Sequence, residues 1–159
     1  MKKTKILTAL LAFTLIFTAL LSGCGDKAEE DKTPALTCSI TVTAADVLEN
    51  EDLISAEKFA LVPDDGIIYQ NDKVEFEEGD MLYDVLTGAL ESEKIQYEAQ
   101  SSSYIVAIGN IYASDCQYGG WLYKVNGEEP SVGCNEYELS DGDVVEFFYV
   151  CDYNAYYGF

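Results

Sequence analysis

The sequence predicts an α+β fold in which one central helix lies across a mixed β-sheet. Alternating apolar and polar residues at 38–43 indicate a half-buried strand near the start of the domain. Residues 81–91 carry apolar side chains three and four positions apart, which is the spacing of one amphipathic helix. Apolar stretches rich in β-branched and aromatic residues follow at 104–108, 121–125 and 144–150. Strands on both sides of a single helix are typical of the α+β class. For a small domain with one such helix across a mixed sheet, the β-grasp is the commonest fold.

The segment between the first strand and the helix predicts three further features. Residues 44–58 have a weak helical tendency around apolar positions. Pro63-Asp64-Asp65-Gly66 has the composition of a turn. Two short strands, at 67–69 and 73–76, are then expected on either side of Asn71-Asp72.

After these strands the helix has a start signal and is followed by shorter elements. Asp80 is placed to cap the helix N-terminus, and the apolar periodicity ends at about Glu91. A strand is expected at 95–98 and a turn or loop at 101–103. Asn126-Gly127 is the strongest short signal for a β-hairpin, because both residues tolerate a positive φ.

The N-terminus has the pattern of a bacterial lipoprotein export signal. Three lysines precede an apolar run at 6–21, and the sequence Leu-Ser-Gly-Cys ends at Cys24. A retained transmembrane helix is the alternative interpretation, but 16 residues are few for a span that needs about 20. We expect Cys24 to be the lipidated residue. The predicted organisation is a lipoprotein signal peptide at 1–23, a flexible acidic tether at 24–35 and one domain at 36–159.

The charge of the chain excludes nucleic acid as a partner. The full chain has 29 acidic and nine basic residues, a net charge of −20, and removal of residues 1–23 takes away three lysines to give −23. Binding to nucleic acid requires a clustered basic surface, and no such cluster occurs. The acidic surface is explained by solubility in the envelope or, alternatively, by binding of divalent cations.

Cysteine usage agrees with an oxidising compartment. Apart from Cys24 the chain has an even number of cysteines, namely Cys38, Cys116, Cys134 and Cys151. We predict a disulfide between Cys116 and Cys134, because they flank the strand at 121–125 and its turn. A second bridge would then join Cys38 to Cys151, but parallel first and last strands would hold these two far apart. Either these two remain free, the strand registers are shifted, or the pairing is different. The spacing of the cysteines and the absence of histidine do not fit a zinc site.

The stretch at 118–127 is the candidate ligand site. It contains a double glycine, through which backbone can approach another surface closely, and the only tryptophan of the chain. Aromatic rings provide contact area while tyrosine and tryptophan keep a polar group. An aromatic platform for a ligand is one interpretation of the tryptophan, and a core position in a small sheet is the other. The candidate ligand-binding residues are Tyr104, Tyr118, Gly119, Gly120, Trp121 and Tyr123.

Several of these motifs together resemble a known family. Glu78-Gly79-Asp80 before the helix, Gly120-Trp121-Leu122-Tyr123-Lys124-Val125-Asn126-Gly127 and Asp141-Gly142-Asp143 are similar to the transcobalamin-like C-terminal domain family. That family is related to the ligand-capping domain of transcobalamin and intrinsic factor and to soluble-ligand-binding β-grasp domains. The resemblance extends over residues 36–152. It implies a β-grasp fold and a cobalamin-type ligand. The large helical domain that makes most cobalamin contacts in the animal carriers has no counterpart in 159 residues.

The motifs of metal sites and of catalysis are weak by comparison. Asp141-Gly142-Asp143 and Glu78-Gly79-Asp80 do not follow the ligand spacing of an EF-hand and are typical of turns at strand ends. Without histidine there is no Ser-His-Asp or Cys-His arrangement, and no phosphate-binding glycine loop occurs. We therefore predict no enzyme activity, no metal and no cofactor.

Two classes of function remain, both on a lipid-anchored protein at the extracytoplasmic face of the membrane. The first is a non-catalytic module that binds a soluble small molecule such as a corrinoid. The second is an interaction or adhesion module for a protein or glycan partner, without a small-molecule ligand. The aromatic residues from Tyr153 to Phe159 either fold back onto the sheet or form an exposed contact patch, and they are the next candidate site.

Overall fold

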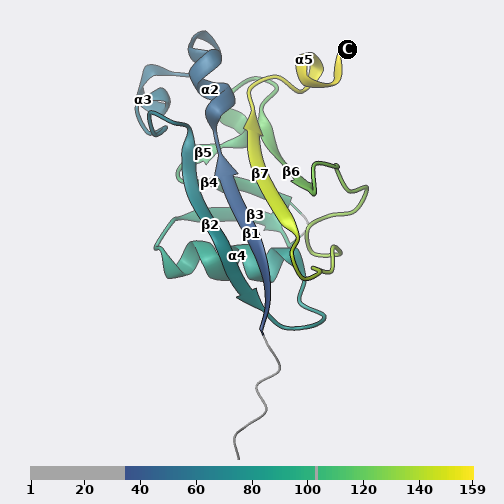
Figure 1. Cartoon of the computed structure of the whole chain (residues 1–159). Coiled ribbons are helices and arrows are strands. Elements are labelled where there is room, and N and C mark those ends of the chain that lie inside the picture. The colour runs from purple at the N-terminus through teal and green to yellow at the C-terminus, as the bar shows by residue number, and fades with distance from the viewer. Residues whose placement is uncertain (1–34, 103) are drawn as a thin grey trace, which may run out of the picture. The chain divides into compact units, whose positions relative to one another are not determined.

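The computed structural model describes residues 35–102 and 104–159, so the predicted signal peptide, the lipidation site Cys24 and Ser103 lie outside the described residues. Figure 1 shows the elements and their labels. In chain order they are β1 (Leu36–Thr43), α2 (Ala45–Glu49), the 3₁₀ helix η1 (Glu51–Leu53), α3 (Ala56–Phe59), β2 (Ile67–Phe76), α4 (Leu82–Ser92), β3 (Tyr97–Ser101), β4 (Tyr104–Ile108), β5 (Ile111–Tyr112), the 3₁₀ helix η2 (Ala113–Asp115), β6 (Gly120–Val125), β7 (Val144–Val150) and α5 (Tyr153–Tyr157).

The main sheet is mixed and has the strand order β2-β1-β7-β6. The first and last strands, β1 and β7, are parallel neighbours at the centre, and both edge strands pair antiparallel. Residues at alternate positions of β1 are fully buried, including Ile40 and Val42, so the predicted alternation is present. The predicted α+β class with a central mixed sheet is confirmed.

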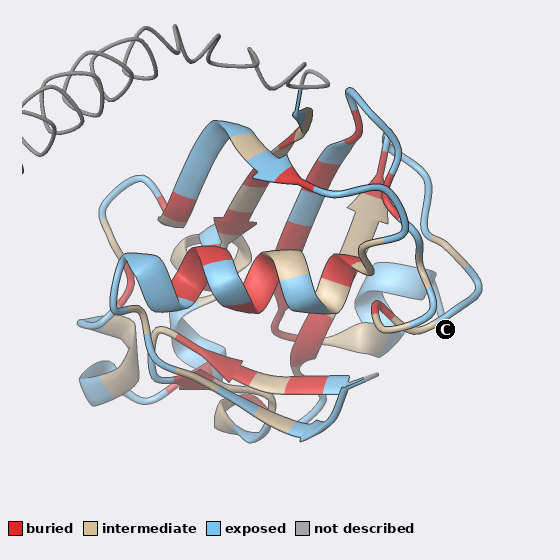
Figure 2. Ribbon diagram, turned by 90° about the horizontal axis from the view of Figure 1, so that it is seen from below, coloured by how far each residue is buried: buried red, intermediate tan, exposed pale blue. Residues whose placement is uncertain are grey.

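Helix α4 covers the inner face of this sheet, as Figure 2 shows from below. Its buried residues include Leu82, Leu86 and Leu90, which follow the predicted helical spacing. The predicted Asp80 cap is wrong by one position, because Met81 is the N-cap and gives no side-chain hydrogen bond. The Asp80 carboxylate accepts instead from the Glu77 amide, and carbonyls of the distant loop at 128–143 accept from the first amides of α4.

The two short strands predicted before α4 are one strand, β2, with an irregularity. Between its pairings with Cys38 and Ile40 of β1, β2 advances from Val74 to Asn71, which is one residue more than β1 advances. The Asn71 side chain accepts from the Lys73 amide within this bulge. Turn chemistry at Asn71-Asp72 thus bends the strand without ending it.

The Asn126-Gly127 turn forms as predicted, but the strand that pairs with β6 comes later. Both residues have positive φ, 54° and 82°, as a type I′ turn requires. Only one bridge, Val125 with Glu128, follows the turn. The chain then forms the loop at 128–143, which supports the start of α4, before β7 returns beside β6.

A second, three-stranded sheet has the order β3-β4-β5. β4 matches its predicted range, whereas β3 starts two residues later than expected because Lys94 has a positive φ of 59° and redirects the chain after α4. The region at 44–58 contains the short helices α2, η1 and most of α3, in agreement with its weak helical tendency. Within residues 35–102 and 104–159, every helix is too short or too polar to span a bilayer.

Candidate functional site

Trp121 belongs to the core of the domain. Only 4% of its surface is exposed, and its ring meets the ring of Tyr149 edge to face at 5.4 Å. The indole N–H donates to the Ile111 carbonyl at 3.0 Å, so its one polar group is satisfied inside the protein. A ligand on the surface cannot reach this ring, and of the two interpretations of Trp121 the core position fits the structure.

Tyr123 also has a structural role. Its ring stacks on Phe147 at 5.3 Å, and its hydroxyl donates to the Val132 carbonyl at 2.6 Å. Burial raises the pKa of Tyr123 to about 12, with neighbouring Cys134 as a smaller cause. Tyr123 therefore holds the loop at 128–143 against the sheet.

Gly119 and Gly120 are required because neighbouring atoms leave no room for a Cβ at either position. Neither residue has a positive φ. A Cβ on Gly119 would lie 2.4 Å from the Tyr149 hydroxyl and 3.0 Å from the Ala113 carbonyl oxygen. A Cβ on Gly120 would lie 2.2 Å from the Tyr153 hydroxyl. The backbone at Gly119 and Gly120 is thus approached closely by side chains of this chain, whereas the sequence-based interpretation was an approach to another surface.

The remaining predicted residues, Tyr104 and Tyr118, are exposed and lie near the C-terminal helix α5. Half of the Tyr118 surface is exposed, and its carbonyl accepts from the Tyr153 amide. Burial raises the pKa of Tyr153 to about 12, and the nearby Tyr104 hydroxyl adds to the shift. Tyr153 stacks parallel to Tyr157 at 6.3 Å between ring centres, and Tyr157 lies 6.3 Å from the ring of Phe159. We call this group the tyrosine surface: Tyr104, Tyr118, Tyr153, Tyr157 and Phe159.

Helix α5 is stabilised by caps at both ends, and hydrogen bonds of its side chains hold it against the rest of the domain. The Asp152 carboxylate accepts from two amides of the first turn, and Gly158 ends the helix in the left-handed conformation. Asp152 before the helix and Gly158 after it are sequence signals from which α5 could have been predicted.

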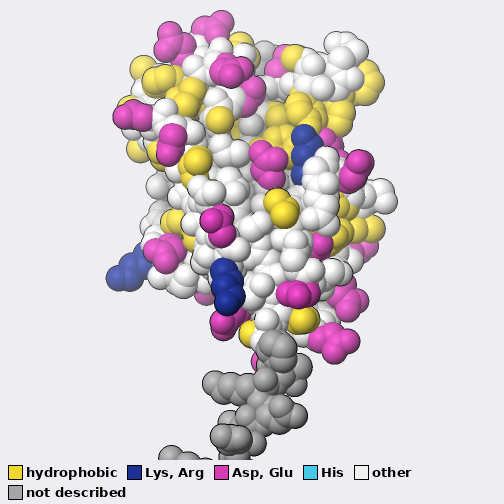
Figure 3. Space-filling view, viewed as in Figure 1, with side chains coloured by type: hydrophobic (Ala, Val, Ile, Leu, Met, Phe, Trp, Pro, Cys, Tyr) yellow, Lys and Arg dark blue, Asp and Glu magenta, His cyan; other side chains and the backbone are white. Residues whose placement is uncertain are grey.

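A loop glutamate and a strand lysine fix the outer side of α5. Glu129 accepts from the Tyr156 hydroxyl at 2.5 Å and from the Tyr157 hydroxyl at 2.8 Å. The hydrogen bond between Tyr157 and Glu129 is the largest cause of the raised pKa of Tyr157, which is about 12. Lys124 lies 4.6 Å over the ring of Phe148 and 5.5 Å from that of Tyr156. Figure 3 shows hydrophobic side chains gathered below α5, whereas acidic side chains are spread over the rest of that face.

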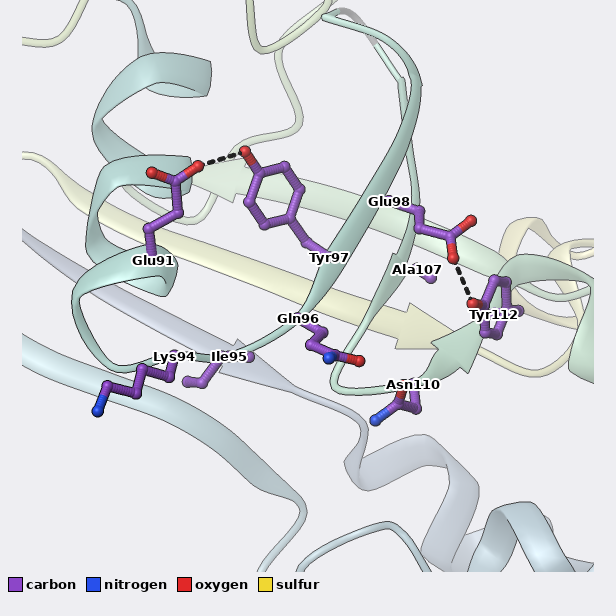
Figure 4. Close-up of a pocket in the computed structure, with 9 residues that line it drawn as sticks. All are labelled: Glu91, Lys94, Ile95, Gln96, Tyr97, Glu98, Ala107, Asn110 and Tyr112. Carbon is purple, nitrogen blue, oxygen red and sulfur yellow. Dashed lines mark hydrogen bonds between the residues drawn. The ribbon is translucent and has the colours of Figure 1, made fainter.

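A separate cavity of about 490 Å³ lies at the far end of α4, beside the three-stranded sheet (Figure 4). Two tyrosine–glutamate hydrogen bonds border it, Tyr97 to Glu91 at 2.9 Å and Tyr112 to Glu98 at 2.5 Å. These bonds raise the pKa of both tyrosines. None of the predicted site residues lines this cavity. Its lining consists of Glu91, Lys94, Ile95, Gln96, Tyr97, Glu98, Ala107, Asn110 and Tyr112.

The acidic motif at 141–143 is a turn whose side chains bind the backbone. Asp143 is buried and accepts from the Asn126 side-chain amide at 2.8 Å and from the Ser140 backbone amide at 3.0 Å. Asp141 accepts from the Thr37 amide at 2.8 Å. Within the described residues, histidine, cysteine and acidic side chains form no group of three suited to a metal ion.

The predicted disulfide between Cys116 and Cys134 is not formed in the structure. Both are buried free thiols, and so are Cys38 and Cys151. The Cys134 thiol donates to the Ser102 carbonyl at 3.5 Å, while Cys116 lies beside Tyr149 and Cys151.

Comparison with known proteins supports a transcobalamin-like fold. Residues 79–150 match a family model described as a domain of unknown function, DUF4430. The structure is similar to haptocorrin in complex with Cbi, with a TM-score of 0.51 and 17% identity over 72% of this chain. The chain spans about a quarter of haptocorrin, 24%. A Ruminococcus gnavus ATCC 29149 protein with a proposed metal-binding function aligns with a TM-score of 0.41 and 19% identity, over 72% of this chain and 95% of that one. No curated protein matches the sequence.

Proposed function

We propose that this chain is the ligand-binding module of a lipid-anchored protein at the extracytoplasmic face of the membrane, and that its ligand packs on the tyrosine surface. The ligand is a corrinoid or a similar amphipathic ring. The module binds without catalysis. Tyr104 and Tyr118 are retained from the predicted ligand-binding residues, while the rings of α5 replace Trp121 and Tyr123.

The observation that carries this proposal is the gathering of four exposed rings around the half-buried Tyr153, from three separate segments at one end of the domain. Tyr104 begins β4, Tyr118 precedes β6, and the other rings come from α5 and the C-terminus. Phe159 is 93% exposed and Tyr157 47%, so these rings contribute little to the core. Exposed aromatic clusters mark sites of interaction, since their burial by a partner is favourable.

The chemistry of a corrinoid fits such a surface. Its ring has broad apolar faces that can cover tyrosine rings, and its amide groups can bond to hydroxyls at the edge. The likeness to haptocorrin, which was solved in complex with Cbi, supports this ligand class. The chain spans a quarter of haptocorrin, and we propose that the tyrosine surface supplies one face of the corrinoid site.

A titration with cobinamide, followed by isothermal calorimetry, tests the proposal. We expect saturable binding to the wild-type chain and at least a tenfold loss of affinity in the double variant Tyr118→Ser/Phe159→Ser, because two contact rings are removed. Leu61→Ser is the matched control, since Leu61 is 48% exposed and lies outside the tyrosine surface. Its affinity should equal that of the wild type.

A second variant separates the tyrosine surface from the cavity of Figure 4. Gln96→Trp places a large ring at an exposed lining position of that cavity. Loss of binding in Gln96→Trp, with wild-type affinity in the tyrosine variant, would move the site to the cavity. Absence of saturable heat with both cobinamide and cobalamin at submillimolar concentration would reject the corrinoid proposal and leave the protein- or glycan-interaction function.

The membrane anchor is tested independently of the ligand. We expect Cys24→Ser to accumulate as uncleaved precursor, because the acceptor of the lipid is removed and stable attachment needs more than one acyl chain. Cell fractionation and the mass of the intact protein measure this outcome. Cys38→Ser is the control and should be processed as the wild type. A correctly cleaved Cys24→Ser protein that stays attached to the membrane would refute lipidation at Cys24.

A further inference from the structure

Two cysteines far apart in the sequence meet below the tyrosine surface. Cys116 lies just before β6, and Cys151 directly follows β7. An isolated parallel β-bridge between Tyr118 and Asp152 holds these two backbone segments side by side. It lies next to the last residue pair of the β6–β7 ladder, Gly120 with Val150. Each cysteine is only 2% exposed.

The surrounding contacts hold both cysteines in place. The Cys116 amide donates to the Tyr149 hydroxyl at 3.3 Å, and the Cys151 amide donates to the Asp46 carboxylate at 2.7 Å. The two side chains are neighbours, since both lie beside the Tyr149 hydroxyl and Cys116 acts on the Cys151 thiol. Burial raises the pKa of the Cys151 thiol, and the neighbouring Cys116 and Asp46 side chains add to this shift.

The other two cysteines lie elsewhere. Cys38 is on β1 near Asp143, and Cys134 is in the loop at 128–143 with its thiol on the Ser102 carbonyl. Burial raises the pKa of both thiols to about 11. Among the described cysteines, Cys116 and Cys151 are therefore the pair that the fold brings together.

We propose that Cys116 and Cys151 are joined by a disulfide bond in the exported protein. During folding, one thiolate attacks a disulfide of a thiol–disulfide oxidant and releases one oxidant thiolate; the second cysteine thiolate then attacks this mixed disulfide. The new sulfur–sulfur bond forms as two electrons pass to the oxidant disulfide, which leaves as two thiols with the two cysteine protons. In the cell the supply of oxidant rests on the proposed extracytoplasmic location.

The bond ties the start of β6 to the residue before Asp152, which caps α5. It therefore fixes the segments that carry Tyr118 and Tyr153. Once folded, the bond is shielded from external thiols by its burial. We expect reductant to act on it slowly in the native protein and quickly in denaturant.

Peptide mapping of the full-length chain tests the bond. The protein is refolded in a glutathione redox buffer, alkylated in denaturant and digested without reduction, so the result is independent of the location in the cell. Trypsin would leave Cys134 and Cys151 on one peptide, because no lysine follows Lys124. A glutamate-specific protease separates them at Glu136, Glu138 and Glu146. The expected result is a peptide pair with Cys116 linked to Cys151, and alkylated Cys38 and Cys134.

Thermal unfolding gives a second readout. After reduction in denaturant and refolding with reductant, the midpoint should fall by about 10 °C relative to the oxidised protein, because the unfolded chain regains loop entropy. In Cys116→Ser the unfolding midpoint should be the same for the oxidised and the reduced protein. In Cys134→Ser the difference of about 10 °C between the two should remain. Cys116 linked to Cys134, or all thiols alkylated with equal unfolding midpoints, would overturn the proposal.

Discussion

Replacement of Trp121 by alanine is expected to lower the free energy of unfolding by about 3–5 kcal/mol. The substitution removes a large, almost fully buried ring, its edge-to-face contact with Tyr149 and its hydrogen bond to the Ile111 carbonyl. The remaining cavity lies between the main sheet and β5, where the packed surroundings can collapse only in part. Urea unfolding, followed by circular dichroism, measures the loss.

Two further substitutions, one at the same residue and one at the next, serve as comparisons. Trp121→Phe keeps most of the ring but leaves the Ile111 carbonyl without its donor, and should cost about 1–3 kcal/mol. Leu122→Ala is the matched control, since Leu122 is half-buried on the opposite face of β6, and should cost less than either. A Trp121→Ala protein with wild-type stability and no cobinamide binding would return Trp121 to the ligand site.

The second large effect is expected at the double glycine, where the two positions should differ. Gly119→Ala places a methyl group against the Tyr149 hydroxyl, the Ala113 carbonyl and the Cys116 side chain, all in buried or backbone structure. We expect a loss of about 1–3 kcal/mol in the free energy of unfolding, as for other overpacked cores. Chemical denaturation measures it.

Gly120→Ala is the paired test, because its methyl group meets the outer end of the Tyr153 side chain. This ring can turn away, so stability should fall less than in Gly119→Ala while α5 and the tyrosine surface are displaced. Cobinamide affinity should therefore decrease in Gly120→Ala more than its stability does. Equal stability losses at both positions, with unchanged binding in Gly120→Ala, would contradict this division of roles.

The elements set by local pattern were predicted from the sequence. The period of apolar residues gave α4 to within one residue at each end, and β4 and β7 occupy their predicted ranges. The Asn126-Gly127 turn has the expected positive φ values because few other residue pairs tolerate them. These features depend on neighbours in the sequence, which a single chain displays directly.

Of the predicted ligand-binding residues, Tyr104 and Tyr118 are exposed and Trp121 is buried, and Trp121 shows why the sequence alone does not separate them. Alternation along β6 indicates that Trp121 and Tyr123 share a face, but it does not say whether this face meets α4 or solvent. That choice is made by β7, whose Tyr149 and Phe147 lie opposite them, on the side where α4 packs. Likewise, the cavity of Figure 4 joins α4, β3 and β5, and no local pattern brings these together.

The sequence by itself determined the class of the fold, the α4 helix, most strands, the key turn and the acidic character, because each depends on residue type and short spacing. The tertiary structure decided which aromatic residues are core and which are exposed, that α5 returns to the sheet through Glu129 and Gly120, and that Cys116 lies beside Cys151 rather than Cys134. These outcomes depend on contacts between residues that are far apart in the sequence, for example 33 and 105 positions apart. The sheet brings these segments together, with the parallel β1–β7 pair at its centre.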